Sequence, residues 1–325
     1  MTEEFQFPAI IRALGRGKNG SRSLTRDEAE FAMRSILTDQ ETPAQLGAFL
    51  MLMRVKEETA EELAGMVAAV RACLSEWSGA SIDLDWPAYA GKRRQPSWYL
   101  LAAQTLASAG YRVFMHGGGE HTPGRQYART VCQALDLPVA ENWLQAQQLT
   151  LHHNLVYSPL AHFAPKLSHI IDMKAELGLR SPVNTLVRNI NPGQARVSLQ
   201  GMFHPSYQAL HHDTAANLGD IHNLVLKGDS GEFEVRPDSD STLLVLSPGH
   251  ETSLTLPKRL QRRSVRPEAP TLEALTGLWQ GQQSDPYGEA AVLATLTPLL
   301  MVLDQVDLAT AEQKAEQLWS ARHHQ

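Results

Sequence analysis

Cysteine is scarce in this chain, and long apolar runs are missing. The 325 residues contain two cysteines, Cys73 and Cys132, which are too few for a framework of disulfide bonds. No stretch of about 18 consecutive apolar residues occurs, so the sequence predicts no membrane-spanning segment. The opening MTEEFQF also lacks the basic and then apolar layout of an export signal. These absences predict a reduced protein of the cytoplasm.

Acidic residues are absent from five long windows. The windows are 5–26, 86–119, 142–171, 177–212 and 252–267, and all 35 acids lie outside them. A net charge of −6 by itself argues against nucleic-acid binding, but this segregation of signs predicts one positive face. The residues expected to contact nucleic acid are Arg16, Lys18, Lys92, Arg93, Arg94, Lys258, Arg259, Arg262, Arg263 and Arg266. Solvated surface loops are the alternative interpretation.

Helical periodicity dominates residues 5–75. Leu46, Phe49, Leu50 and Met53 recur at i, i+3, i+4 and i+7, as on the buried face of a helix. The candidate N-caps of these helices include Thr25, Thr42 and Thr59. The pattern predicts an all-helical lobe.

Strands and helices alternate after residues 79–87. We expect a small helical domain at 1–78, joined by part of 163–185, and a larger domain at 79–325. Alternation predicts an α/β fold with a mainly parallel sheet. The expected strands are residues 111–115, 155–157, 223–227 and 242–246.

A glycine-rich turn follows the first of these strands. The stretch 111–125 reads YRVFMHGGGEHTPGR, so the strand runs into His116 and then Gly117, Gly118 and Gly119. Free backbone N–H groups at such a turn, together with the dipole of the next helix, favour an anion. A tight connection without a ligand remains the alternative.

Four segments carry a family resemblance: GRGKNGSRSLTRDEA, QLGAFLMLMRVKEETAEELAG, MHGGG and YSPLAHFAPKLSHIIDMKAELGLRSPVNTL. They are similar to the anthranilate phosphoribosyltransferase family, glycosyltransferase family 3, and the similarity weakens after about residue 235. The resemblance implies a nucleoside phosphorylase/phosphoribosyltransferase-like fold and a dimer formed through the helical domain. It also implies magnesium and phosphoribosyl pyrophosphate in the hinge cleft, with transfer of the phosphoribosyl group to anthranilate.

The family's donor-site residues are changed in this sequence. Its glycine-threonine-glycine-glycine-aspartate loop corresponds to residues 89–94, YAGKRR, where Gly91 is the glycine that remains. Its aspartate–glutamate pair for magnesium corresponds to Phe233 and Glu234, which makes Glu234 a weak metal candidate. Because contacts are lost at both ends of the leaving group, we expect little transferase activity.

More of the family's residues remain elsewhere in the cleft. His116 and Gly117 match the family's lysine-histidine-glycine-asparagine-arginine turn, His162 is kept, and Arg180 matches the arginine that faces the anthranilate carboxylate. The expected anion and cleft residues are therefore Gly91, His116, Gly117, Gly118, Gly119, His162 and Arg180.

The altered phosphate loop and the GRGKN segment resemble the divergent YbiB-type branch, whose dimeric members bind nucleic acid. We predict a catalytically silent homodimer that contacts the backbone of DNA or RNA without sequence preference and needs no cofactor or phosphoribosyl pyrophosphate. Trp86, Trp98 and Tyr99 are expected in the core, with stacking on bases as the alternative. The alternative function is a phosphoribosyltransferase with anthranilate or an altered acceptor, using magnesium held by Glu234 and Asp229.

Overall fold

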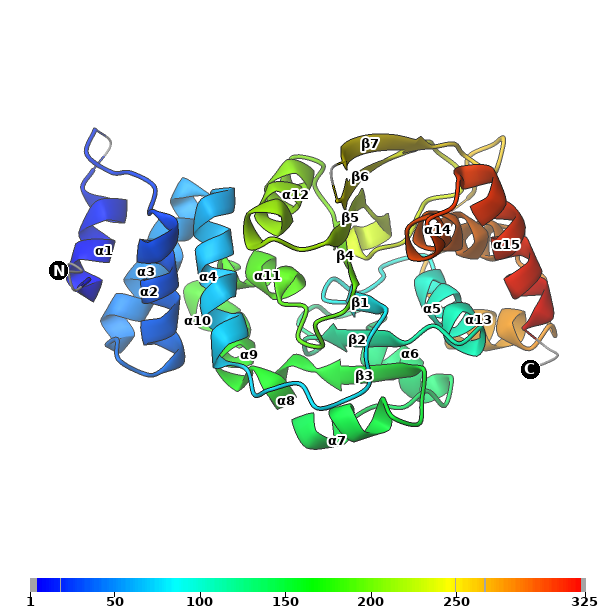
Figure 1. Ribbon diagram of the computed structural model, residues 1–325, viewed down its shortest axis with the longest axis horizontal. Coiled ribbons are helices and arrows are strands. Elements are labelled where there is room, and N and C mark those ends of the chain that lie inside the picture. Colours follow the sequence, from blue (N-terminus) through cyan, green and yellow to red (C-terminus); the bar gives the residue numbers. More distant parts are fainter. Residues whose placement is uncertain (1–4, 18, 249, 266, 323–325) are drawn as a thin grey trace.

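The computed structural model describes residues 5–17, 19–248, 250–265 and 267–322. A helical layer lies at one end, a seven-stranded sheet crosses the middle, and further helices cover the other end (Figure 1). This arrangement confirms the predicted fold class, a small helical domain followed by a larger α/β domain whose sheet is mainly parallel.

Four helices build the amino-terminal layer. They are α1 Phe7–Gly15, α2 Arg26–Leu37, α3 Pro43–Lys56 and α4 Ala60–Cys73. Thr25, Thr42 and Thr59 each accept a hydrogen bond from the backbone N–H three residues later, and the Glu or Gln there accepts one in return. These capping boxes set the starts of α2, α3 and α4, as the sequence predicted.

The apolar face of this layer shares a core with residues 160–190. Phe49, Leu50 and Met66 are fully buried in one cluster with Leu167 and Leu186. The helices of that segment are α8 Leu160–Phe163, α9 Pro165–Asp172, α10 Lys174–Leu177 and α11 Val183–Leu186. The segment thereby joins the helical layer to the sheet.

The sheet has the order β3-β2-β1-β4-β5-β6-β7, in which β1 to β5 are parallel and β6 and β7 are antiparallel. The strands are β1 Leu84–Pro87, β2 Val113–Gly117, β3 Leu155–Pro159, β4 Val197–Met202, β5 His222–Lys227, β6 Ser241–Ser247 and β7 His250–Leu256. The chain builds outward from β1 to β3 and then returns to place β4 on the other side of β1. Ligands of open α/β sheets gather at the carboxyl ends of strands beside such a switch.

Helices cover both faces of the sheet. One face carries α5 Trp98–Ser108, α6 Ala128–Ala134, α13 Leu272–Trp279, α14 Pro286–Asp304 and α15 Leu308–Ala321. The other carries α7 Trp143–Leu149 and α12 Tyr207–Leu218 (Figure 1). By length and hydropathy α14 would suffice to cross a membrane, but 72% of its apolar window is buried inside the fold. We therefore assign α14 to the core of this domain.

Three strands were not predicted from the sequence, namely β1, β4 and β7. Polar residues interrupt their apolar pattern: those of β7 at 252, 253 and 255 are exposed, whereas several of those in β4 are paired inside the fold. In β4, Gln200 donates to Asn189 Oδ1 at 2.7 Å, and Ser198 Oγ accepts from Asn223 Nδ2 at 2.8 Å. Such pairs of buried groups become visible only after the strands are assembled.

Candidate functional site

Three loops meet at the carboxyl edge of the sheet beside the switch point. They follow β1, β4 and β5, and comprise residues 88–97, 203–206 and 228–236. Their side chains form a buried ionic cluster and two cavities with cationic linings.

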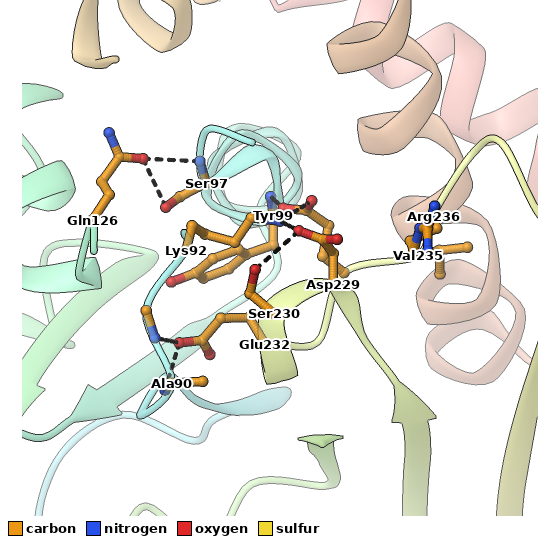
Figure 2. A network of polar contacts seen from close by, with 12 residues as sticks. Ala90, Lys92, Ser97, Tyr99, Gln126, Asp229, Ser230, Glu232, Val235 and Arg236 are labelled. Atoms are coloured by element: carbon orange, nitrogen blue, oxygen red, sulfur yellow. Dashed lines mark hydrogen bonds and ion pairs between the residues drawn. The ribbon is translucent and has the colours of Figure 1, made fainter. Parts of the chain in front are cut away.

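Lys92 lies at the centre of the buried cluster, and its side chain is fully buried. Its Nζ donates to Asp229 Oδ2 at 2.5 Å (Figure 2). The same Nζ also donates to Glu234 Oε1. Burial alone would lower the pKa of Lys92, but the attraction of Glu234 and Asp229 outweighs it and holds the pKa above its ordinary value. The charged ammonium is therefore the counter-ion of two carboxylates.

Glu232 places another buried carboxylate against the loop after β1. Its Oε1 accepts from the N–H of Ala90 at 2.7 Å (Figure 2) and from the N–H of Gly91 at 2.5 Å. Gly91 has φ +68, a left-handed backbone that favours glycine. Converging N–H groups of this kind form the concave sites that bind phosphate in other proteins. Here a carboxylate of the chain itself occupies them.

Glu234 completes the arrangement, which we call the lysine–carboxylate cluster: Lys92, Asp229, Glu232 and Glu234. Its Oε2 accepts from the N–H of Tyr99 in the first turn of α5 at 2.9 Å. Burial raises the pKa of Glu234 to about 7, with Lys92 opposing the rise. Burial likewise raises the pKa of Glu232, against the attraction of Arg188 and the two N–H groups.

The cluster does not fit a magnesium site. Among the described residues, no group of three or more His, Cys, Asp or Glu side chains is placed to hold a metal ion. Glu234 and Asp229, the ligands expected under the transferase alternative, both contact the Lys92 ammonium, which would repel a second cation. Phe233 is fully buried against Trp86 and supplies no oxygen ligand. Glu234 is therefore a partner of lysine in this structure.

The basic residues expected to contact nucleic acid fall into different environments. Lys92 is a correction, because the carboxylates draw its side chain entirely into the interior. Arg259 is half-buried and donates to Glu312 Oε1 at 3.2 Å, so it helps to hold α15. Lys18 and Arg266 lie outside the described residues. The exposed members are Arg16, Arg93, Arg94, Lys258, Arg262 and Arg263.

These exposed cations lie on segments that are far apart in the fold, whereas the sequence predicted one positive face. Arg16 follows α1 at one end of the molecule, whereas the segment 258–263 lies between β7 and α13, toward the other end (Figure 1). Arg112 precedes β2, at the edge of the sheet opposite Arg93 and Arg94. Windows without acids describe composition along the chain, and the fold distributes them over several surfaces.

The glycine turn after β2 has one glycine required by packing. A Cβ at Gly117 would lie 2.3 Å from the carbonyl oxygen of Ala88, so no side chain fits there. A Cβ at Gly119 would meet no atom of the described residues within 4 Å. Gly117, Gly118 and Gly119 line a cavity of about 380 Å³, and Arg129 lines it as well. The tight-connection interpretation thus accounts for Gly117, and space for a ligand remains beside Gly119.

The two cleft histidines have different environments. His116 is fully buried, with Nδ1 at 2.7 Å from the Tyr89 hydroxyl and Nε2 at 3.3 Å from Asp85. His162, on α8, is half-buried, and burial together with Arg129 lowers its pKa. The structure therefore places His116 in the interior, where it contacts no cavity described above.

Arg180 lies in a cationic cavity of about 270 Å³, which we call the arginine pocket. The arginines that line it are Arg54, Arg125, Arg180 and Arg188. None of the described lining residues is acidic. Burial, and then repulsion by Arg125, lower the pKa of Arg180, whose Nη2 lies 3.1 Å from His121 Nε2. Arginines gathered without a carboxylate attract an anion.

A second cavity of about 300 Å³ adjoins the arginine pocket, and we call it the basic groove. The cations that line it are Arg93, Arg94, Lys227 and Arg236, and the acidic residue that lines it is Asp229, whose carboxylate contacts Lys92. Phe203 and Ser230 line both cavities, so the two are neighbours along the carboxyl edge of the sheet. Arg236 donates to Asp238 at 2.9 Å, which leaves Arg93, Arg94 and Lys227 as the exposed cations of the groove.

Sequence reasoning missed Glu232 and Phe203. The alternation of Glu232, Phe233 and Glu234 was a usable signal, because residues two apart in an extended chain point the same way. Trp86, Trp98 and Tyr99 are fully buried, which confirms the core interpretation. The exposed aromatic ring at the site is instead Phe203, with 59% of its surface accessible.

Comparison with known proteins agrees with this architecture. A profile of the glycosyl transferase family helical bundle domain matches residues 8–73. The uncharacterized Escherichia coli K12 protein YbiB is 29% identical over 234 residues, covering 70% of this chain and 72% of that protein. The anthranilate phosphoribosyltransferase of Beijerinckia indica is 29% identical over 289 residues, covering 89% of this chain and 80% of that protein. The structure of anthranilate phosphoribosyltransferase from Thermus thermophilus superimposes with a TM-score of 0.76 at 20% sequence identity, covering 97% of this chain and 95% of that chain.

The helical layer, the sheet order and the position of the cleft define a two-domain protein of the phosphoribosyltransferase-like class. The chain belongs to the anthranilate phosphoribosyltransferase-like family, glycosyltransferase family 3.

Proposed function

We propose that this protein has lost the family's metal-dependent transfer and binds the backbone of a nucleic acid along its cationic cavities. The observation that carries the first part is the lysine–carboxylate cluster. Lys92 supplies a positive charge between Asp229 and Glu234, where a metal would be needed. Glu232 saturates the N–H groups of Ala90 and Gly91, which a diphosphate would need. A metal-bound diphosphate would have to displace both side chains.

The second part of the proposal rests on the cations that remain accessible. The arginine pocket and the basic groove adjoin, and together they present guanidinium and ammonium groups along the carboxyl edge of the sheet. Arg93 and Arg94 are exposed at the rim of the groove. Neutralising several phosphates with such groups releases counter-ions, which gives affinity without base recognition. The overall negative charge then limits binding to this cationic region.

The double variant Arg93→Ala, Arg94→Ala tests this contact. We expect its affinity for a short oligonucleotide to fall about 10-fold, and the slope of log affinity against log salt to become shallower by about 1.5. Fluorescence anisotropy between low and moderate salt measures both quantities. Arg112→Ala, which removes an exposed charge at the opposite edge of the sheet, is the control. An unchanged slope in the double variant, or no binding by the wild type at low salt, would reject nucleic-acid binding at this site.

Phosphoribosyl transfer to anthranilate or an altered acceptor is the second candidate, and the comparisons favour it. Relatives such as the Beijerinckia indica protein are named anthranilate phosphoribosyltransferases, and their names do not refer to nucleic-acid binding. The arginine pocket also provides Arg180 for the carboxylate of an acceptor. This candidate requires the lysine–carboxylate cluster to open and admit a metal, so donor binding decides between the two functions.

We further propose a cytoplasmic homodimer formed through the helical layer. This proposal rests on the family resemblance, and Val55, an apolar residue near the end of α3 that is 81% exposed, would lie in such an interface. Sedimentation equilibrium distinguishes the dimer from a monomer, and a monomer at all concentrations would reject it.

A further inference from the structure

We propose that the junction of the arginine pocket and the basic groove binds an unpaired base of a single-stranded nucleic acid, with Phe203 as its stacking platform. This inference rests on the proposed nucleic-acid binding and specifies the form of the partner and the residue that contacts its bases.

Phe203 has the position and exposure that a stacking platform needs. It follows the last residue of β4, Met202, at the switch point of the sheet. Phe203 is 59% exposed although it is apolar, and the His204 ring lies edge-on to its ring with centroids 4.9 Å apart. A base stacked on the open face would remove this apolar surface from water.

Cations lie on both sides of Phe203. The arginine pocket, with Arg54 and Arg180, is on one side, and the basic groove, with Arg93 and Arg94, is on the other. Phe203 lines both cavities. A strand crossing this junction would place phosphates near arginines before and after the stacked base. A positive groove interrupted by an exposed aromatic ring is the usual architecture of single-strand binding.

Buried polar atoms in the arginine pocket also lack partners. Ser181 is 5% exposed, and its hydroxyl has no hydrogen-bond partner among the described residues. Asn184 lines the same pocket, and its side-chain oxygen also has no partner among the described residues. Buried polar groups are normally hydrogen-bonded, and a polar ligand in the pocket would be a partner for these two groups. The amide and hydroxyl suit the edge of a base or a sugar hydroxyl, beside the arginines that suit phosphate.

A double-stranded nucleic acid does not fit the junction at Phe203 in the same way as a single strand. In a duplex each base is paired and stacked on both faces, so Phe203 could contact a base only after that base had left the stack. Cavities of about 270 and 300 Å³ are matched to a few nucleotide groups rather than to a helix with two backbones. We therefore expect the protein to prefer single strands.

Anisotropy titrations with three probes test the inference: a short oligothymidylate, the same strand paired with its complement, and an abasic strand of equal length. We expect the wild type to bind oligothymidylate at least about 10-fold more tightly than either other probe. Phe203→Ala should weaken oligothymidylate binding about 5- to 100-fold and change abasic binding less than about 2-fold. Phe203→Tyr, which keeps the ring, should restore most of the affinity. Ile221→Ala, equally exposed at the opposite edge of the sheet, should have no effect.

Two failures have different meanings. If all probes bind equally and Phe203→Ala changes none of them, while Arg93→Ala, Arg94→Ala weakens all, the stacking inference is rejected and the proposed function stands. If no probe binds to the wild type at low salt, the proposed function is rejected and the inference fails with it.

Discussion

Replacing Lys92 by methionine is expected to lower the free energy of unfolding by about 3–5 kcal/mol. The Lys92 side chain is fully buried, and its ammonium contacts Asp229 and Glu234. Methionine fills a similar volume but leaves these carboxylates without their counter-ion. Urea unfolding at neutral pH measures the loss. Arg94→Met, in the same loop but exposed, should change stability by no more than about 0.5 kcal/mol.

A double-mutant cycle separates the charge effect from the loss of packing. Adding Glu234→Gln to Lys92→Met removes one buried charge of each sign, so the double variant should recover part of the stability that the single variant loses. Equal stability of the Lys92→Met variant and the wild type would show that the ammonium does not neutralise the carboxylates. Additive losses in the double variant would show that Lys92 and Glu234 do not interact.

The second large effect is expected in acid, where the free energy of unfolding should fall because His211 is buried in its neutral form. Burial, and then repulsion by Arg188, lower the pKa of His211 from 6.5 to about 3, and its Nδ1 lies 3.1 Å from the side-chain nitrogen of Asn189. Between about pH 6.5 and 3 the unfolded chain therefore binds a proton that the folded chain excludes. The stability that depends on neutral His211 is complete above pH 6.5 and falls as the pH decreases. At pH 4.5 the loss is about 3 kcal/mol.

His211→Gln isolates this contribution, because glutamine stays neutral at every pH used. Urea unfolding of both proteins at pH 7.5 and 4.5 should give a smaller acid-induced loss for the variant, by about 3 kcal/mol. Burial raises the pKa values of Glu232 and Glu234, so their contribution to stability changes with pH in the opposite direction to that of His211. This contribution is the same in both proteins and therefore cancels in the comparison. An identical loss in both proteins would contradict the burial of a neutral His211.

Local signals in the sequence were sufficient for the helical domain and for the fold class. The capping boxes at Thr25, Thr42 and Thr59 are encoded within four residues each, so they can be recognised without tertiary information. The strands β1 and β4 were harder, because polar residues interrupt their apolar pattern, and the partners of those in β4 come from other elements. Gln200 and Ser198 depend on Asn189 and Asn223, which come from other elements of the fold.

The candidate site was predicted in part. The family resemblance predicted that residues 89–94 and the pair Phe233 and Glu234 belong to the site, and the structure brings these two segments together. It could not show that Lys92 turns inward, because 137 residues separate it from Asp229 and 142 from Glu234. A run of lysine and arginine resembles a solvated loop until the buried carboxylates are placed against it. The position of Phe203 between two cavities depends in the same way on the assembled sheet.

The central claim is that Lys92 and Glu232 occupy the places of a metal and a diphosphate. Isothermal titration calorimetry with phosphoribosyl pyrophosphate and magnesium tests it most directly, with an active anthranilate phosphoribosyltransferase as the positive control. We predict no saturable heat for this protein up to about 1 mM ligand. Saturable binding of one ligand per chain that requires magnesium would contradict the claim and would restore the transferase function.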